Sequence, residues 1–123
     1  MAAWEVEFHD RFEAEFDKWP QVVREELLAH AGLLARFGPS LGRPHADTLI
    51  GSSHANMKEL RFSASERVWR VAFAFDPNRR AILLVGGNKS GGGEKRFYKA
   101  LIQRADQRYA EHLVSLKSTK RSR

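Results

Sequence analysis

Three cations of this chain are placed where they could act together on a phosphodiester. Arg61 and Arg70 lie inside two neighbouring apolar segments, MKELRF and VWRVAFAF, and Lys89 follows a third, just beyond a pair of glycines. Fixed guanidinium and ammonium groups stabilise the negative charge that develops when a 2′-hydroxyl attacks the adjacent phosphate of RNA. If the three side chains meet at one surface, that surface suits cleavage of RNA.

More cations and an aromatic residue fall in the first turns of the last helix that the sequence predicts. Lys95, Arg96, Tyr98 and Lys99 lie within five residues of one another. Cations at a helix N-terminus oppose the helix dipole, so another interaction must favour them there. We predict that Lys95, Arg96 and Lys99 bind RNA together with Lys58. Because the sequence has no clear pair of histidines or carboxylates for the proton transfers, a lysine with a lowered pKa or a tyrosine would have to serve.

Each of these residues also has a purely structural interpretation. Arg61 could form an ion pair with Glu59, which lies two residues earlier on the same strand face. Arg70 could be a structural arginine at the edge of the sheet. Tyr98 belongs to an apolar helical stripe and could be part of the core.

Several other kinds of site are excluded or weakly indicated. The chain has no cysteine, and its five histidines are scattered without metal-ligand spacing. It contains no P-loop motif, and the glycines at 91–93 are only a weak signal for a phosphate-binding turn. We therefore predict no metal and no cofactor.

Charge is distributed unevenly along the 123 residues. Residues 1–60 carry six basic and ten acidic side chains, whereas residues 61–123 carry fifteen basic and five acidic ones. Such asymmetry favours an acidic partner for the second half, nucleic acid first, although a solvated basic surface would give the same counts. The length suits one domain, expected over 1–117, with a basic disordered tail over 118–123. Without a long apolar run or a signal sequence, we expect a cytoplasmic protein with no membrane partner.

The elements that must position these residues follow from apolar periodicity. They are a strand over 4–8, helices over 10–19 and 20–37, strands over 57–63, 67–76 and 81–85, and a helix over 94–117. Short connections between the last three strands predict an antiparallel meander that gathers Arg61, Arg70 and Lys89 on one concave surface. We therefore predict an α+β fold, in which two N-terminal helices and one C-terminal helix pack on a small antiparallel sheet.

Four segments of the chain resemble a known family. They are LGRPHADTL from Leu41, MKELRF from Met57, VWRVAFAFDP from Val68 and AILLVGGNK from Ala81. Together they are similar to the phage-derived Gp49-like family, within the HigB/RelE superfamily of type II toxin–antitoxin toxins. The resemblance extends over residues 4 to 115, approximately.

The resemblance implies a RelE-like domain that cleaves mRNA in the ribosomal A site and is neutralised by a helix-turn-helix antitoxin of the HigA type. It implies that Arg61, Arg70, Lys89 and Tyr98 are catalytic, with Tyr98 stacking on a base or aiding proton transfer. RelE itself uses lysines where this chain has Met57 and Glu59, which leaves the general base unassigned. The superfamily also includes ParE-like gyrase inhibitors, so the alternative is a non-enzymatic gyrase inhibitor or a nucleic-acid-binding phage-derived protein.

Overall fold

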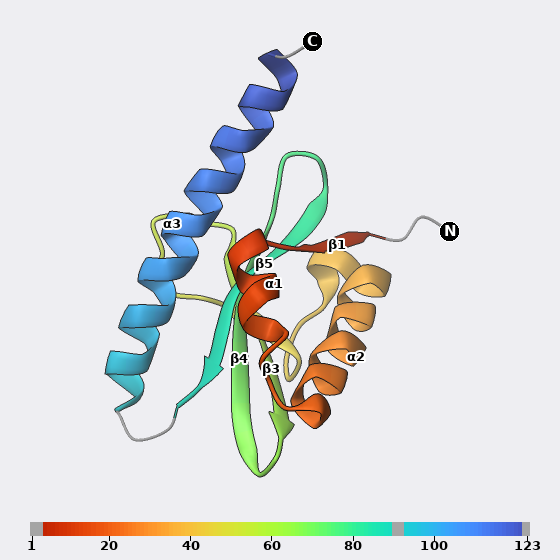
Figure 1. The fold of residues 1–123 in the computed structure, drawn as a ribbon, viewed down its shortest axis with the longest axis vertical. Helices are drawn as coiled ribbons and strands as arrows, with labels where there is room; N and C mark the ends of the chain where they lie inside the picture. The colour runs from red at the N-terminus through yellow and green to blue at the C-terminus, as the bar shows by residue number, and fades with distance from the viewer. Residues whose placement is uncertain (1–3, 90–92, 122–123) are drawn as a thin grey trace.

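The computed structural model describes residues 4–89 and 93–121, which form three α-helices and one five-stranded sheet (Figure 1). In chain order the elements are β1 (Glu5–Phe8), α1 (Asp10–Phe16), α2 (Gln21–Phe37), the 3-10 turn η1 (Gly38–Ser40), β2 (Ala46–Thr48), β3 (Met57–Ala64), β4 (Arg67–Phe75), β5 (Arg80–Asn88) and α3 (Glu94–Arg121). The predicted α+β architecture is confirmed.

The strand order is β1-β5-β4-β3-β2, and β2 to β5 pair antiparallel in sequence order, as the meander predicted. The sheet is nevertheless mixed, because β1 pairs parallel with the first half of β5. No hairpin dictates the direction of β1, since both N-terminal helices and the whole meander separate it from its partner in the chain.

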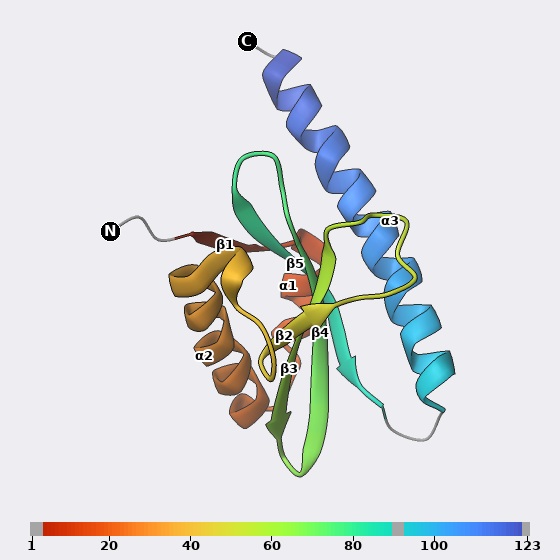
Figure 2. The same cartoon turned by 180° about the vertical axis from the view of Figure 1, so that it is seen from behind.

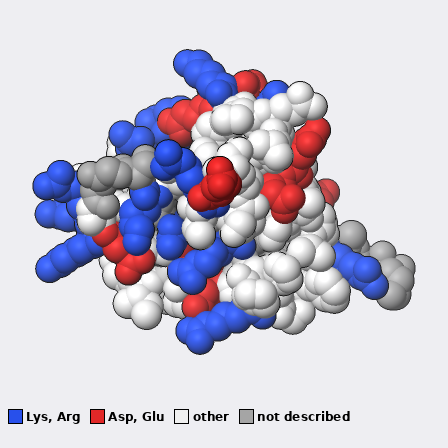
Figure 3. Space-filling view, turned by 90° about the horizontal axis from the view of Figure 1, so that it is seen from below, with Lys and Arg blue, Asp and Glu red and all other residues white. Residues whose placement is uncertain are grey.

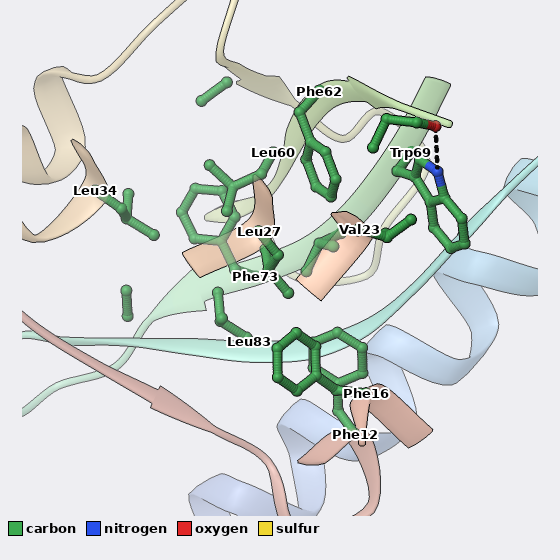
Figure 4. Close-up of a cluster of buried hydrophobic side chains, with 14 of the residues drawn as sticks. Phe12, Phe16, Val23, Leu27, Leu34, Leu60, Phe62, Trp69, Phe73 and Leu83 are labelled. Atoms are coloured by element: carbon green, nitrogen blue, oxygen red, sulfur yellow. Dashed lines mark hydrogen bonds between the residues drawn. The ribbon is translucent and has the colours of Figure 1, made fainter. Parts of the chain in front are cut away.

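The sheet lies between α1 and α2 on one face and α3 on the other (Figure 1). The α1/α2 side holds the larger apolar cluster, which includes Phe12, Phe16, Val23, Leu27, Leu34, Leu60, Phe62, Trp69, Phe73 and Leu83 (Figure 4). The Trp69 indole N–H donates to the Ala64 carbonyl at 3.1 Å. Because side chains alternate along a strand, burying Trp69 and Phe73 on this face directs Arg70 to the α3 face.

Two helix ends differ from their predictions. Helix α1 begins at Asp10 as predicted, after the N-cap His9, whose Nδ1 accepts from the Arg11 backbone N–H at 3.2 Å, but it ends at Phe16 rather than at residue 19. The last helix continues to Arg121, so residues 118–121 of the expected tail are helical. No glycine or proline after Lys117 interrupts the helix. In the described part of the chain, no helix is both long and apolar enough to cross a membrane.

The loop between β2 and β3 fixes α3 over the sheet, passing beside the helix in Figure 2. Its Ser52 hydroxyl donates to the Asp106 carboxylate of α3, and Ser53 donates to the same carboxylate through its backbone N–H at 2.9 Å and its hydroxyl at 3.0 Å. Further along α3, the Tyr109 hydroxyl donates to the Phe75 carbonyl at 3.1 Å. These bonds attach the middle of α3 to the β2–β3 loop and to the end of β4.

Candidate active site

Arg61 of β3 and Arg70 of β4 are direct cross-strand partners on the face that α3 covers. Like charges in directly opposed positions destabilise a sheet unless neighbouring groups compensate them. Here Glu59 lies 3.4 Å from Arg61, and Glu94 lies 3.9 Å from Arg70. The predicted convergence of the two arginines is therefore real, and two carboxylates come with it.

Arg70 is held in a nearly closed environment with only 7% of its surface exposed. Its guanidinium lies 5.7 Å from the ring centre of Phe97 and 5.5 Å from that of Tyr98, both in the first turns of α3. Among the described residues, its buried Nε has no hydrogen-bond partner. The strand that carries it is central in the sheet, so Arg70 is not an edge arginine. Buried polar atoms without a partner are rare in proteins, and each one requires an explanation, such as stored strain or a functional role.

Glu59, Arg61 and Tyr98 form one connected group. The Tyr98 hydroxyl donates to Glu59 Oε1 at 2.8 Å and accepts from Arg61 Nη2 at 3.2 Å. The same Nη2 lies 3.4 Å from Glu59 Oε2. Glu59 is only 4% exposed, whereas the Arg61 side chain is 47% exposed. The group thus has a buried acid at its base and a cation open to solvent.

Burial sets the protonation properties of this group. It raises the pKa of Glu59, although the Tyr98 hydrogen bond and the charges of Arg61 and Arg70 act in the opposite direction. Burial also raises the pKa of Tyr98, with the Arg61 hydrogen bond opposing it and the Glu59 contacts adding to it. The Tyr98 hydrogen bond in turn raises the pKa of Arg61. A carboxylate whose pKa is raised, beside a protonated phenol, is suited to accept and return a proton.

Lys89 joins the site through Glu94. Its Nζ lies 3.5 Å from Glu94 Oε1, the oxygen that Arg70 Nη2 approaches at 3.9 Å. The carboxylate of Glu94 therefore occupies a position between two cations, where a phosphoryl oxygen would also be stabilised. Arg61, Arg70, Lys89 and Tyr98 are thus brought to one region, with Lys89 at its margin.

The cations predicted at the start of α3 lie at the surface beside this region. Lys95, Arg96 and Lys99 are exposed, and Arg96 lines a cavity of about 290 Å³ together with Lys89 and Phe97. Figure 3 shows Lys and Arg side chains gathered where α3 begins, at the left of that view. Their placement is compatible with the predicted contact to RNA.

Lys58 lies apart from these cations, which corrects its predicted grouping with Lys95, Arg96 and Lys99. It alternates with Glu59 along β3, so its side chain leaves the sheet on the α1/α2 face. Its Nζ donates to the Pro39 carbonyl at 3.3 Å, beside the end of α2. The alternation of side chains along the strand was enough to predict that Lys58 and Arg61 point to different faces of the sheet.

Two further kinds of site considered from the sequence, a phosphate-binding glycine turn and a metal site, gain no support from the described residues. The glycine turn is only partly visible, because residues 91 and 92 lie outside the described residues. Within the described ranges, no group of three or more His, Cys, Asp or Glu is arranged to hold a metal ion.

Glu59 is the first of two residues of the candidate site that sequence reasoning missed, since it was considered only as an ion-pair partner of Arg61. A signal was present: Glu59 and Arg61 share a strand face, and the small Ala72 lies opposite Glu59 on β4. A carboxylate beside a small residue under a covering helix becomes buried, and burial is what raises its pKa. Glu94 was missed as well, although it is the first residue of α3.

Comparison with protein families supports a relationship over most of the chain. The model of the family described as "Phage derived protein Gp49-like" matches residues 14–110. A protein of Mycobacterium tuberculosis named as toxin HigB2 is 41% identical over 115 residues, covering 93% of this chain. A second protein of that organism, named as toxin HigB3, is 49% identical over 105 residues, covering 82% of this chain. The chain spans 57% of the length of HigB2 and 90% of that of HigB3.

Among solved structures, a double-arginine mutant of the Escherichia coli toxin RelE in the free state has a similar fold. The TM-score is 0.58 with 16% sequence identity, covering 81% of this chain and 94% of that structure. At this identity the similarity concerns the fold alone, so any role for the site depends on the residues described above.

Proposed function

Because this chain belongs to the phage-derived Gp49-like family, we propose that it is the toxin of a type II toxin–antitoxin system and an mRNA interferase that cleaves mRNA on the ribosome. The single observation that carries the proposal is the connected group of Glu59, Arg61 and Tyr98 beside the buried Arg70. It offers a proton acceptor, a proton donor and fixed positive charge, which are the elements of phosphodiester cleavage by an internal 2′-hydroxyl.

In the proposed reaction, Glu59 takes the proton of the 2′-hydroxyl as the new O–P bond forms. Arg61, Arg70 and Lys89 stabilise the charge on the phosphoryl oxygens. The bond from phosphorus to the 5′-oxygen breaks, and Tyr98 supplies the proton to that leaving oxygen. The products are a 2′,3′-cyclic phosphate and a 5′-hydroxyl.

The hydrogen bond between Tyr98 and Glu59 closes the cycle, because Glu59 can return its proton to the phenolate across 2.8 Å. The raised pKa of Tyr98 keeps the phenol protonated before the reaction, and the raised pKa of Glu59 makes it a stronger base than an exposed carboxylate. The mechanism requires no metal, and it assigns the general base that the departures at Met57 and Glu59 left open.

The partners follow from the same proposal. A toxin of this class acts in the cytoplasm on ribosome-bound mRNA and is neutralised by a cognate antitoxin. We expect that antitoxin to carry a helix-turn-helix domain and to be encoded in the reading frame next to this one.

Induction of the protein without its antitoxin tests the proposal. Growth should stop, and primer extension should map new 5′ ends within translated codons. Arg61→Ala should abolish the breaks, because it removes the exposed cation of the group, with a loss of at least about 10²-fold. Lys58→Ala, on the other face of the same strand, is the matched control and should still cleave.

Intact transcripts during the arrest would contradict the nuclease. DNA-damage signalling under those conditions would favour a gyrase inhibitor instead. Equal effects of the Arg61 and Lys58 substitutions on cleavage would show that the group around Arg61 is not the active site.

A further inference from the structure

The segment from Leu41 to Asp47, which reads LGRPHAD, is not used by the proposed reaction, yet it is built directly onto the strand of Arg61. The Arg61 backbone N–H donates to the His45 carbonyl at 2.9 Å. Leu41 and Ala46 are buried and anchor the segment at both ends. A loop that is anchored by buried side chains and hydrogen-bonded to the strand of a candidate site is suited to place a further side chain near the reacting group.

The side chain that this loop presents is Arg43. Its Nε donates to Asp47 Oδ2 at 2.8 Å, while Asp47 Oδ1 accepts from the Thr48 backbone N–H at 2.8 Å. These bonds lower the pKa of Asp47, the Thr48 bond most strongly, so the carboxylate stays ionised and continues to orient the guanidinium. The Arg43 side chain is 82% exposed. The Arg43 guanidinium is therefore oriented by Asp47 through Nε and is still accessible to a ligand.

Arg43 and Arg61 line one cavity of about 490 Å³, together with Pro44, Ala46 and Asp47. Two guanidinium groups thus share this cavity with a single carboxylate, which is already paired with Arg43. Guanidinium groups bind phosphate through paired N–H donors, and two of them around one cavity favour an anion with several oxygens. Asp47 lies opposite Glu59 in the pairing of β2 with β3, so the cavity is a direct extension of the candidate site.

We propose that Arg43 and Arg61 form a binding site for the backbone phosphate of the nucleotide next to the one that is cleaved. The identity of the ligand as RNA rests on the proposed function. In this arrangement Arg61 contacts both phosphates, and Arg43 contacts only the neighbouring one. The contact is made to the backbone, so it positions the strand without selecting its sequence.

The test measures RNA binding without cleavage. A single-stranded oligonucleotide whose 2′-hydroxyls are all methylated cannot react, so fluorescence anisotropy reports binding alone. Arg43→Ala should weaken its binding about 3- to 10-fold at low salt, as expected for one lost charged contact. The slope of log K against log salt should become shallower by about 0.7, the value for one phosphate of a single strand.

Two variants control for charge and folding. Lys18→Ala removes an exposed cation in the turn after α1, on the other side of the sheet, and should change neither affinity nor slope. Arg43→Lys keeps the charge but loses the paired donors, so it should retain the wild-type slope with intermediate affinity. Because Arg43 is exposed, all these variants should melt at the wild-type temperature.

Wild-type affinity and slope in Arg43→Ala would overturn the proposal, as would a wild-type protein that binds no oligonucleotide. Unchanged RNA binding combined with weakened binding of the co-expressed antitoxin would also overturn it and assign the cavity to an acidic protein segment. Failure of the proposed function has a different signature: RNA binding that depends on Arg43 in a protein that causes no mRNA breaks in cells.

Discussion

Replacing Glu59 by glutamine should separate activity from stability. Glutamine has nearly the same shape and can still accept the Tyr98 hydroxyl hydrogen bond, so the packing beneath α3 should be preserved. It cannot take a proton, so cleavage should fall about 10²- to 10⁴-fold, the usual contribution of a general base. The same change should make the protein more stable at neutral pH, because the wild-type protein holds a charge in a buried position that disfavours it.

The magnitude follows from the surroundings of the carboxylate. Glu59 is 4% exposed and loses most of its hydration. Its nearest cation, Arg61, is half-exposed and 3.4 Å away. An ion pair with such an exposed cation stabilises the ionised carboxylate by at most about 1 kcal/mol. Removing a destabilising charge at a functional site typically stabilises a protein by about 0.5–2 kcal/mol. For a domain of this size, each 1 kcal/mol should raise Tm by about 3–6 °C.

The pH dependence of stability gives an independent test of whether Glu59→Gln stabilises or destabilises the protein. The pKa of Glu59 is raised in the folded protein, so its stabilising contribution is complete below its unfolded pKa and is lost as the pH rises through its folded pKa. Thermal melts of both proteins from pH 4 to 8 should therefore coincide at the acidic end. Toward neutral pH the Glu59→Gln protein should become progressively the more stable of the two.

The opposite trend would refute this reasoning. If Glu59→Gln were less stable than the wild type and the deficit grew with pH, the two arginines would dominate over burial and the pKa of Glu59 would be lowered. Cleavage at the wild-type rate by Glu59→Gln would remove Glu59 from the mechanism, whatever its effect on stability.

Two further substitutions test the remaining parts of the site. Glu94→Gln removes the carboxylate that lies near both Arg70 and Lys89, so we expect single-stranded RNA to bind about 2- to 5-fold more tightly in anisotropy measurements; unchanged affinity would mean that these cations do not receive the substrate phosphate. Tyr98→Phe keeps the ring beside Arg70 but removes the proton donor, and should slow cleavage by about 10²-fold or more in a ribosome-programmed assay while RNA affinity changes little. Cleavage at the wild-type rate would assign Tyr98 to packing alone.

The pattern of residues within single strands was enough to predict several features of the fold and of the candidate site. Alternation along two strands is enough to place Arg61 and Arg70 on one face, and short connections are enough to make those strands antiparallel neighbours. The same alternation places Lys58 on the opposite face. These properties depend on residues close together in the chain, which is why they could be predicted without coordinates.

The tertiary structure decided which residues the proposed reaction uses. From the sequence, Tyr98 was equally compatible with the core and with a site; the packing of α3 over the sheet places its hydroxyl 2.8 Å from Glu59. Burial is the main cause of the raised pKa of Glu59, and Tyr98 of α3 lies directly against its carboxylate. Arg43 faces the same region only because its loop bonds to the Arg61 backbone through His45. Burial, hydrogen-bond partners and pKa depend on groups far apart in sequence, and the periodicity of a single segment contains no information about them.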